Sequence, residues 1–253
     1  MAIKKRKYGW IRDSLDPRDL HFSSIMPTKA IEFPPLVDLE AQCSPVEDQK
    51  SVGSCTANAL VGALEFLQIR QEGEFVEDLS RLFLYYNERV IEGTVCSDAG
   101  AELRDGIKSL ASTGICDEKL WPYDVKKFDH KPSKQCYADA AHHKIIKYYK
   151  IATLDGMRQC LTMGFPFVFG FAVFESFNII GKDGIMPLPN PEVEELEGGH
   201  AIMACGFDEE RRLFKIRNSW GPSWGRKGYF FMPYEFIADK RFCSDFWLIS
   251  REM

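Results

Sequence analysis

Apolar residues recur at helical spacing in the first half of the chain. In CTANALVGALEFLQIR, which starts at Cys55, Leu60 and Leu64 stand one turn apart and predict a helix with a tight apolar face. Ser54 is suited to cap its N-terminus. LSRLFLYYNERVIEG and GAELRDGIKSLASTG predict two further helices, and Gly114 gives the latter a C-terminal stop. The first half is therefore expected to be mostly helical.

Short apolar and aromatic runs dominate the second half. Each is rich in β-branched or aromatic residues and bounded by Gly, Pro or Asp: HKIIKYYKIA, FPFVFGFAVF, HAIMACGFD, RLFKIRNSW and GYFFMPY. Such runs predict strands. Helices followed by strands predict an α+β protein, and the boundary between two lobes is where a ligand cleft is expected.

The first 35 residues follow neither pattern. Turn signals in LDPRD and FPPLVD bracket a stretch without a sustained helical period. We therefore separate an N-terminal leader, residues 1–35, from a folded unit, residues 36–253. Within that unit the helical part covers about 36–140 and the β part about 141–253. The basic start MAIKKRKYGW lacks the apolar core of a secretory signal.

Composition narrows the range of functions. The chain has 253 residues and a formal net charge of -5, which argues against a nucleic-acid-binding surface. No window reaches the roughly 18 uninterrupted apolar residues of a membrane-spanning helix, so no membrane partner is expected. The eight cysteines form no Cys-x-x-Cys pair, and neither a metal site nor a cofactor is predicted. We expect mostly reduced thiols, in a protein that is cytoplasmic or exported without a recognisable signal peptide.

Cys55 differs from the other cysteines in its position at the first turn of a predicted helix. The helix dipole and the unsatisfied N–H groups there favour thiolate over thiol. Taken alone, Cys55 would still be interpreted as a buried helix cysteine. Three segments change that interpretation, because they supply the Gln, His and Asn of a cysteine hydrolase: EDQKSVGSC, GGHAIMACGF and RNSWGPSWGRKGYF.

Together these segments resemble the papain-like cysteine peptidases, over about residues 36–238. The resemblance implies a two-lobed α+β fold, with a helical left lobe, a β-barrel-like right lobe and the active site in the cleft between them. It implies Cys55 as nucleophile and His200 as general base and acid. It also implies Asn218 as the residue that orients the imidazole, and Gln49 as the side-chain donor of the oxyanion hole. The implied reaction is hydrolysis of a peptide or protein substrate through an acyl-thioester, without a cofactor.

The resemblance also indicates residues that bind substrate. Trp220 matches a tryptophan that shields the Asn–His hydrogen bond, and Trp224 matches a platform on the leaving-group side, although both could be ordinary core aromatics. Gly100, in SDAGAELRDG, falls where the family's backbone pairs with an extended substrate, the alternative being a turn before a helix. Gly199, directly before the histidine, is expected to line the same site.

Two positions depart from the family pattern. Val52 stands where the family has a half-cystine, and Asp98 lies roughly where its partner would be, which fits a reduced compartment. Thr56 replaces the tryptophan that usually follows the nucleophile, so the packing there is left open. The polar passage at 124–140 is interpreted as an exposed insertion between the lobes, with His130 as a solvated residue.

The leader is much shorter than the long helical pro-segment common in the family, and resembles the short leaders of bacterial and viral members. We expect it to lie against the enzyme and partly occlude the cleft, which would make the full-length chain less active than a shortened one. The alternative is a leader packed as padding on the back of one lobe. Its candidate anchors are Tyr8, Trp10, Ile11, Leu15, Leu20 and Phe22.

Two other functions share this pattern. A peptide-binding module could keep the cleft without hydrolysis, although the intact Cys55, His200 and Asn218 argue against it. An acyl-transferring enzyme would resolve the thioester with an amine in place of water, and the sequence does not separate it from a hydrolase. The leading interpretation is a monomeric cysteine peptidase that acts on extended peptides, with endo- and exopeptidase action both open.

Overall fold

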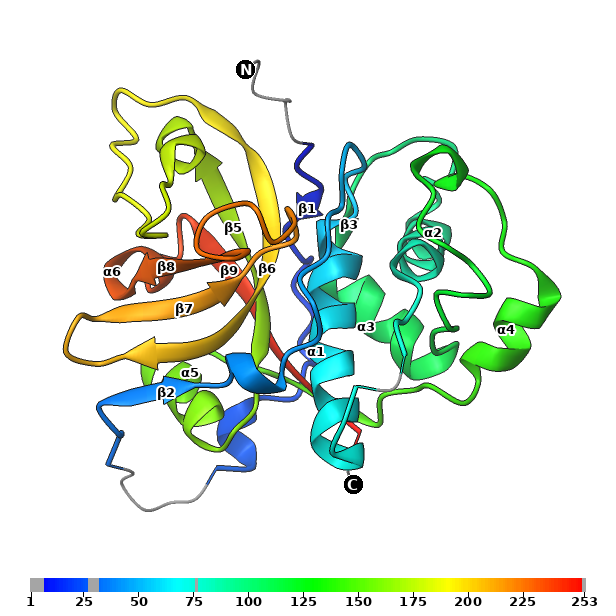
Figure 1. Ribbon diagram of the computed structural model, residues 1–253, viewed down its shortest axis with the longest axis horizontal. Coiled ribbons are helices and arrows are strands. Elements are labelled where there is room, and N and C mark those ends of the chain that lie inside the picture. Colours follow the sequence, from blue (N-terminus) through cyan, green and yellow to red (C-terminus); the bar gives the residue numbers. More distant parts are fainter. Residues whose placement is uncertain (1–6, 27–31, 76, 252–253) are drawn as a thin grey trace.

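A helical lobe and a lobe built on a β-sheet lie side by side, as Figure 1 shows. The computed structural model describes residues 7–26, 32–75 and 77–251 of the chain. Helices dominate one lobe and antiparallel strands the other, so the predicted α+β class is confirmed.

The helical lobe is built on α1 (Cys55–Glu72), α2 (Arg81–Glu92) and α3 (Leu103–Ser112). These coincide with the three predicted helical stretches. Helix α1 contacts α2 and α3 on one side and β6 of the sheet on the other, so it forms the boundary between the lobes (Figure 1). Its residues 55–67 are buried because both lobes pack against this part of the helix.

The passage predicted as an insertion contains η3 (Val125–Lys127) and a short helix, α4 (Lys134–Ala140), at the outer side of the helical lobe (Figure 1). Cys136 and Ala140 on α4 are buried, so this helix packs onto the lobe, and the predicted position between the lobes is wrong. His130 is exposed, as expected.

The sheet of the other lobe has the strand order β4-β9-β5-β6-β7-β8, with β2 paired to β6, among the described residues. All of these pairings are antiparallel. The predicted runs form β4 to β8, whereas β2, β9 and helix α5 (Leu154–Thr162) were not predicted. The strands are β2 (Leu36–Asp38), β4 (Lys147–Lys150), β5 (Phe167–Phe174), β6 (Leu196–Asp208), β7 (Leu213–Arg217), β8 (Tyr229–Pro233) and β9 (Cys243–Ser250).

The chain crosses between the lobes more than once. Strand β2 pairs Val37 with Phe207 of β6, so residues 36–38 belong structurally to the sheet, although they open the segment predicted as helical. Three short helices also belong to the folded unit: η2 (Glu40–Gln42), η4 (Glu175–Ile179) after β5, and α6 (Tyr234–Ile237).

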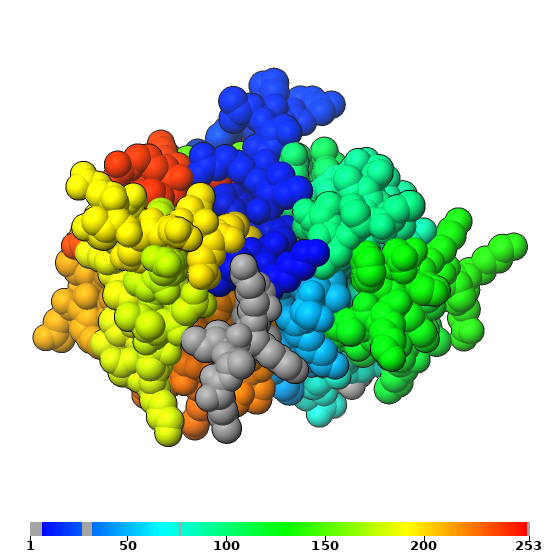
Figure 2. Space-filling model, turned by 90° about the horizontal axis from the view of Figure 1, so that it is seen from above, coloured from blue at the N-terminus to red at the C-terminus, as the bar shows by residue number. Residues whose placement is uncertain are grey.

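The leader runs between the two lobes. Its strand β1 (Trp10–Ile11) pairs in parallel with β3 (Ala101–Glu102) of the helical lobe. Seen from above, leader atoms fill the space between the lobes (Figure 2). The leader continues to η1 (Phe22–Ser24), where the Phe22 side chain is buried in the core.

The predicted anchors of the leader divide into two groups. Tyr8, Trp10 and Phe22 pack against the hydrophobic core. Ile11, Leu15 and Leu20 are 43%, 95% and 56% exposed, so these three do not anchor it. Among the predicted anchors, the contact is thus made by the aromatic rings.

None of the helices in the described ranges is long and apolar enough to cross a membrane. All eight cysteines fall within those ranges, and each is a free thiol. Val52, at the position where the family has a half-cystine, is buried as a core residue.

Candidate active site

Cys55 begins α1, where the helical lobe meets the sheet. Its sulfur accepts hydrogen bonds from the backbone N–H groups of Ala201 and of Gly9 in the leader. Burial nevertheless raises the pKa of the Cys55 thiol to about 12, against an ordinary value of 9.0. The expected preference for thiolate at a helix N-terminus is therefore outweighed by desolvation, and the leader-covered state holds a neutral thiol.

Ser54 occupies the N-cap position of α1, but its side chain caps no backbone N–H. Its hydroxyl instead shares a 2.6 Å hydrogen bond with the Tyr123 hydroxyl and accepts one from the Asn58 amide at 3.1 Å. The predicted cap residue thus fixes the loop beside the nucleophile.

His200 and Asn218 form the hydrogen bond that a catalytic pair needs. His200 lies on β6 and Asn218 directly follows β7, and the antiparallel pairing of these strands brings them together. The Nε2 of His200 donates to Asn218 Oδ1 at 2.7 Å. Because that acceptor fixes the proton on Nε2, the Nδ1 lone pair is the one that can take a proton from another group.

Tryptophans cover this hydrogen bond. The Trp220 ring centroid lies 5.1 Å from that of His200, with the planes 30° apart, and the side chain is only 3% exposed. Trp224 packs edge-on against Trp220 at 5.0 Å, and Phe177 contacts both rings. Exclusion of water strengthens the His–Asn bond and holds the imidazole in one orientation.

Gln49 presents its amide to a peptide carbonyl. Its Nε2 donates to the carbonyl oxygens of Val52 and of Lys7 in the leader, both at 3.1 Å. Its Oε1 accepts from Ser219 Oγ at 2.6 Å, which fixes the side chain beside the His–Asn pair. A donor held in this way can stabilise an oxyanion that develops from a carbonyl.

The leader covers all of these groups. The Tyr8 ring lies 6.1 Å from the rings of both His200 and Trp220, and its hydroxyl donates to Glu197 at 2.9 Å. Gly9 approaches the Cys55 loop so closely that a Cβ on it would come 1.8 Å from the Gly53 carbonyl oxygen. No side chain fits there, which explains a glycine at this point of the leader.

The two glycines predicted to bind substrate also meet the leader. A Cβ on Gly100, which has a φ of +82°, would come 2.2 Å from the Gly9 carbonyl oxygen, and the neighbouring Ala101 N–H donates to that oxygen at 2.8 Å. A Cβ on Gly199 would come 2.5 Å from the Trp10 carbonyl oxygen. An extended segment of the leader therefore occupies the place expected for an extended substrate.

Asp98 and Asp13 hold the leader, and sequence reasoning missed both roles. Asp98 accepts from the Gly53 N–H at 3.0 Å and pairs with the Lys7 ammonium at 2.7 Å. In the sequence SDAG, Asp98 stands two residues before Gly100, which was predicted to bind substrate. This proximity is the sequence feature that could have indicated its role.

The second missed residue, Asp13, is buried in the leader and bridges to the body. Its Oδ2 accepts from the Trp247 indole at 2.7 Å, and its Oδ1 accepts from the Arg104 N–H at 3.1 Å. Its own N–H donates to Asp245 Oδ2 at 2.8 Å. Burial, and then the nearby charge of Asp245, raise the pKa of Asp13 to about 7.

Thr56 has a clear role. Its hydroxyl donates at 2.8 Å to Glu88 Oε2, and both residues are fully buried. Burial raises the pKa of Glu88 to about 8. The hydroxyl side chain after the nucleophile therefore satisfies one oxygen of a buried carboxyl group on α2, whose other oxygen, Oε1, has no hydrogen-bond partner among the described residues.

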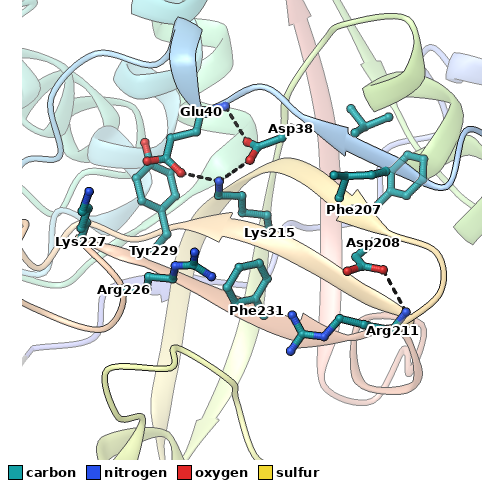
Figure 3. A pocket seen from close by; sticks show the side chains of 12 residues that line it. Asp38, Glu40, Phe207, Asp208, Arg211, Lys215, Arg226, Lys227, Tyr229 and Phe231 are labelled. Carbon is teal, nitrogen blue, oxygen red and sulfur yellow. Dashed lines mark hydrogen bonds and ion pairs between the residues drawn. The ribbon is translucent and has the colours of Figure 1, made fainter.

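A cavity of about 320 Å³ lies elsewhere, beside β2, β7 and β8 (Figure 3). At its wall the Lys215 ammonium bonds the Asp38 carboxylate at 2.7 Å and pairs with Glu40. Arg211 and Arg226 lie on the Phe231 ring, 5.7 and 5.8 Å from its centroid. No predicted site residue lines this cavity, so it is not the site built around Cys55.

Comparison with known sequences agrees with this geometry. The model of the papain family cysteine proteases matches residues 33–240. An uncharacterized peptidase C1-like protein, L477 of Acanthamoeba polyphaga mimivirus, is 44% identical over 214 residues, which cover 80% of this chain and 68% of the relative. Pro-cathepsin H of Bos taurus is 28% identical over 209 residues, and the match spans 78% of this chain but only 59% of that relative.

Comparison with solved structures confirms the predicted papain-like fold. The crystal structure of xylellain, a cysteine protease from Xylella fastidiosa, superposes with a TM-score of 0.90 at 43% identity, over 100% of both chains. Digestive procathepsin L 3 of Tenebrio molitor larval midgut shares the fold at a TM-score of 0.69 and 16% identity, over 92% of this chain and 74% of that one. The chain therefore belongs to the papain family of cysteine proteases.

Proposed function

We propose that this protein is a cysteine peptidase that hydrolyses peptide bonds with Cys55, His200, Asn218 and Gln49. The observation that carries the proposal is the arrangement of these residues. The buried His200–Asn218 hydrogen bond lies next to Ala201, whose N–H contacts the Cys55 sulfur, and the Gln49 amide already binds a peptide carbonyl oxygen.

The reaction follows from these positions. His200 Nδ1 takes the proton of the Cys55 thiol, and the sulfur attacks the carbonyl carbon of the substrate. The Gln49 Nε2–H and the Cys55 N–H stabilise the oxyanion, each contributing about 3 to 4 kcal/mol in comparable hydrolases. The C–N bond then breaks as His200 gives its proton to the leaving amine. Water, deprotonated by His200, hydrolyses the resulting thioester and restores the thiol.

The leader acts as a built-in inhibitor of this site. Lys7 offers its carbonyl oxygen to Gln49, Tyr8 lies against the His200 ring, and Gly9 contacts Cys55. A substrate cannot reach these groups until residues 7–10 leave. Their departure also exposes Cys55 to water, which removes the desolvation that keeps the thiol neutral.

The site is complete within one chain, which supports action as a monomer on peptide or protein substrates. The free state of all eight cysteines supports a reducing setting, either the cytoplasm or a destination reached without a recognisable signal peptide. The net charge of -5 supports partners other than nucleic acid.

Cleavage of a diverse peptide library tests the proposed reaction. The wild-type chain should produce new C-termini that carry one ¹⁸O atom from labelled water, and Cys55→Ala should produce none. Cleavage that persists in Cys55→Ala would contradict the proposal. Products that carry an added amine in place of water would assign the thioester to acyl transfer.

A shortened chain tests inhibition by the leader separately. A chain that begins at Phe33 should have a lower KM for small peptides with a similar kcat, because loss of a tethered competitor changes access and not chemistry. An equal KM in a folded shortened chain would refute inhibition while leaving the peptidase assignment intact.

A further inference from the structure

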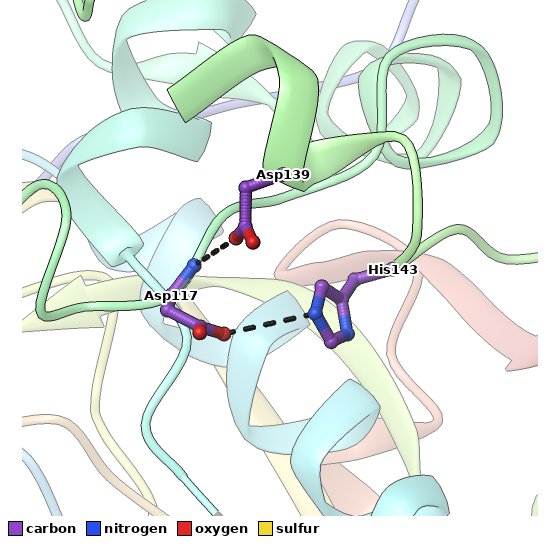
Figure 4. A group of neighbouring side chains, drawn as sticks. All are labelled: Asp117, Asp139 and His143. Carbon is purple, nitrogen blue, oxygen red and sulfur yellow. Dashed lines mark hydrogen bonds and ion pairs between the residues drawn. The ribbon is translucent and has the colours of Figure 1, made fainter. Parts of the chain in front are cut away.

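Three side chains that can bind a metal converge in the helical lobe, away from the peptidase site (Figure 4). Asp117 lies in the loop after α3, Asp139 on α4, and His143 just beyond α4. One ligand atom from each lies within 4.8 Å of the other two. The ligands come from separate elements, so no sequence motif announces them.

The spacing of Asp117 and His143 suits two ligands of one cation. Asp117 Oδ1 lies 3.7 Å from His143 Nε2, too far for a hydrogen bond. Two ligands at zinc's usual bond lengths in a tetrahedral arrangement are about 3.3 Å apart, so a small adjustment would suffice. Figure 4 shows the carboxylate directed at the imidazole.

One oxygen of the Asp117 carboxyl group, Oδ1, also lacks a donor. This atom is buried and has no hydrogen-bond partner within the described part of the chain. A buried polar atom without a partner costs about 1 to 3 kcal/mol, and native structures contain few of them. A cation at this point would satisfy the oxygen.

The local charge favours a cation as well. The Glu77 carboxyl group lies within hydrogen-bonding distance of the Asp117 side chain, and the Asp117 N–H donates to Asp139 Oδ2 at 3.0 Å. The Lys119 ammonium, which lies 3.3 Å from Glu77 and is 79% exposed, offsets part of the negative charge of these three carboxyl groups. One divalent cation would balance the negative charge that gathers here.

Helix α1 supplies the support that a metal-binding imidazole usually has. The side-chain Nε2 of Gln68 on α1 lies 3.3 Å from His143 Nδ1. A 180° rotation of the amide places its oxygen at this point, and Nδ1–H then donates to Gln68 while the Nε2 lone pair faces Asp117. A second hydrogen bond of this kind fixes the ring for coordination.

We propose that Asp117, Asp139 and His143 bind a divalent cation of the zinc type, with Glu77 placed to complete the ligand set. The mixed imidazole and carboxylate donors suit zinc better than calcium, which takes oxygen ligands alone. The bound ion would tie α4 to the loop before α2, to the loop after α3 and to the end of α1. Its role is to stabilise the helical lobe.

Binding is measured on full-length Cys55→Ala protein freed of metal by a chelator, so that the nucleophilic thiol does not compete. Co²⁺ should bind with one-to-one stoichiometry and give visible d–d absorption that Zn²⁺ abolishes. Zn²⁺ at a hundred times its Kd should raise the Tm by about 5 °C or more. The outcome does not depend on peptidase activity.

His143→Gln should weaken binding by about 100-fold or more, whereas His142→Gln, at the exposed neighbouring histidine, should leave the Kd unchanged. If His143→Gln fails to fold, Asp139→Asn provides the same test, because its amide oxygen can still accept from the Asp117 N–H. Lack of stoichiometric binding, equal Kd values for the two histidine variants, or intense cobalt–thiolate absorption would each overturn the proposal.

Discussion

Trp10→Ala is expected to open the active site of the full-length chain. The indole of Trp10 lies directly on the backbone of two sheet glycines. A Cβ on Gly170 would come 1.8 Å from the ring, and one on Gly199 would come 2.7 Å from it. Because both glycines lack side chains, the ring fills the slot that they leave, and its loss removes most of the apolar contact of β1.

The expected magnitude follows from this contact. Full burial of a large apolar side chain contributes about 1.5 to 3 kcal/mol. Trp10 is partly buried, and its indole N–H is buried with no hydrogen-bond partner among the described residues, so about 2 kcal/mol is a suitable value. At 1.36 kcal/mol per factor of ten, the open state gains about 30-fold. The apparent KM should fall by up to about 30-fold, with kcat unchanged.

The assay is the initial rate of hydrolysis of a fluorogenic peptide, with mass spectrometry to show that the leader remains intact. Leu15→Ala is the matched control, because this leader side chain is 95% exposed and should not alter the KM. Trp10→Phe keeps a ring in the slot and should stay close to the wild type. If Trp10→Ala and Leu15→Ala have the same KM, the reasoning is refuted.

Three further predictions concern the reaction, its pH dependence and stability. His200→Ala should abolish turnover, and Asn218→Ala should leave a measurable rate. Gln49→Ala should lower kcat by about 10²- to 10³-fold. A kcat close to wild type in His200→Ala would remove His200 from the mechanism. The pKa of Asp13 rises from an ordinary 3.8 to about 7 when the leader is bound, so the contribution of Asp13 to leader binding is complete below about pH 4 and is lost as the pH rises to about 7. The ratio of the KM of the wild-type chain to that of Asp13→Asn should therefore fall between pH 5 and 7, and a constant ratio would exclude this linkage. Thr56→Val should lower the free energy of unfolding by about 1 to 3 kcal/mol, since Glu88 loses a buried donor, and an unchanged denaturation midpoint would show that the bond contributes nothing.

The sequence predicted those elements whose pattern is long or sharply bounded. Helices α1 to α3 carry an apolar face over at least ten residues, and β5 to β8 are apolar or aromatic runs between turn residues. Helix α5 was missed because it has only nine residues and includes Gly156, although Leu154, Met157 and Leu161 recur at helical spacing. Strand β2 was missed because three residues carry too little pattern, and its partner β6 lies far along the chain.

The site residues likewise divide into those that local sequence motifs predicted and those that only the fold brings together. Cys55, His200, Asn218 and Gln49 were named from local motifs, and the structure places them together. Asp13 was not predicted, because its three partners lie 91 to 234 residues away and only the fold brings them close. The neutral state of the Cys55 thiol was also missed. It depends on burial beneath the leader, whereas the helix N-terminus alone indicated a thiolate.

The central claim is that leader residues 7–10 cover a competent Cys55, and the rate of labelling by a thiol-directed peptidyl epoxide tests it most directly. The chain shortened to begin at Phe33 should be labelled rapidly, once, and at Cys55. The full-length chain should be labelled at the same residue at least tenfold more slowly, a conservative limit given the roughly 30-fold effect expected from Trp10 alone. Equal rates for the two chains, or labelling at the exposed Cys96 in place of Cys55, would contradict the account.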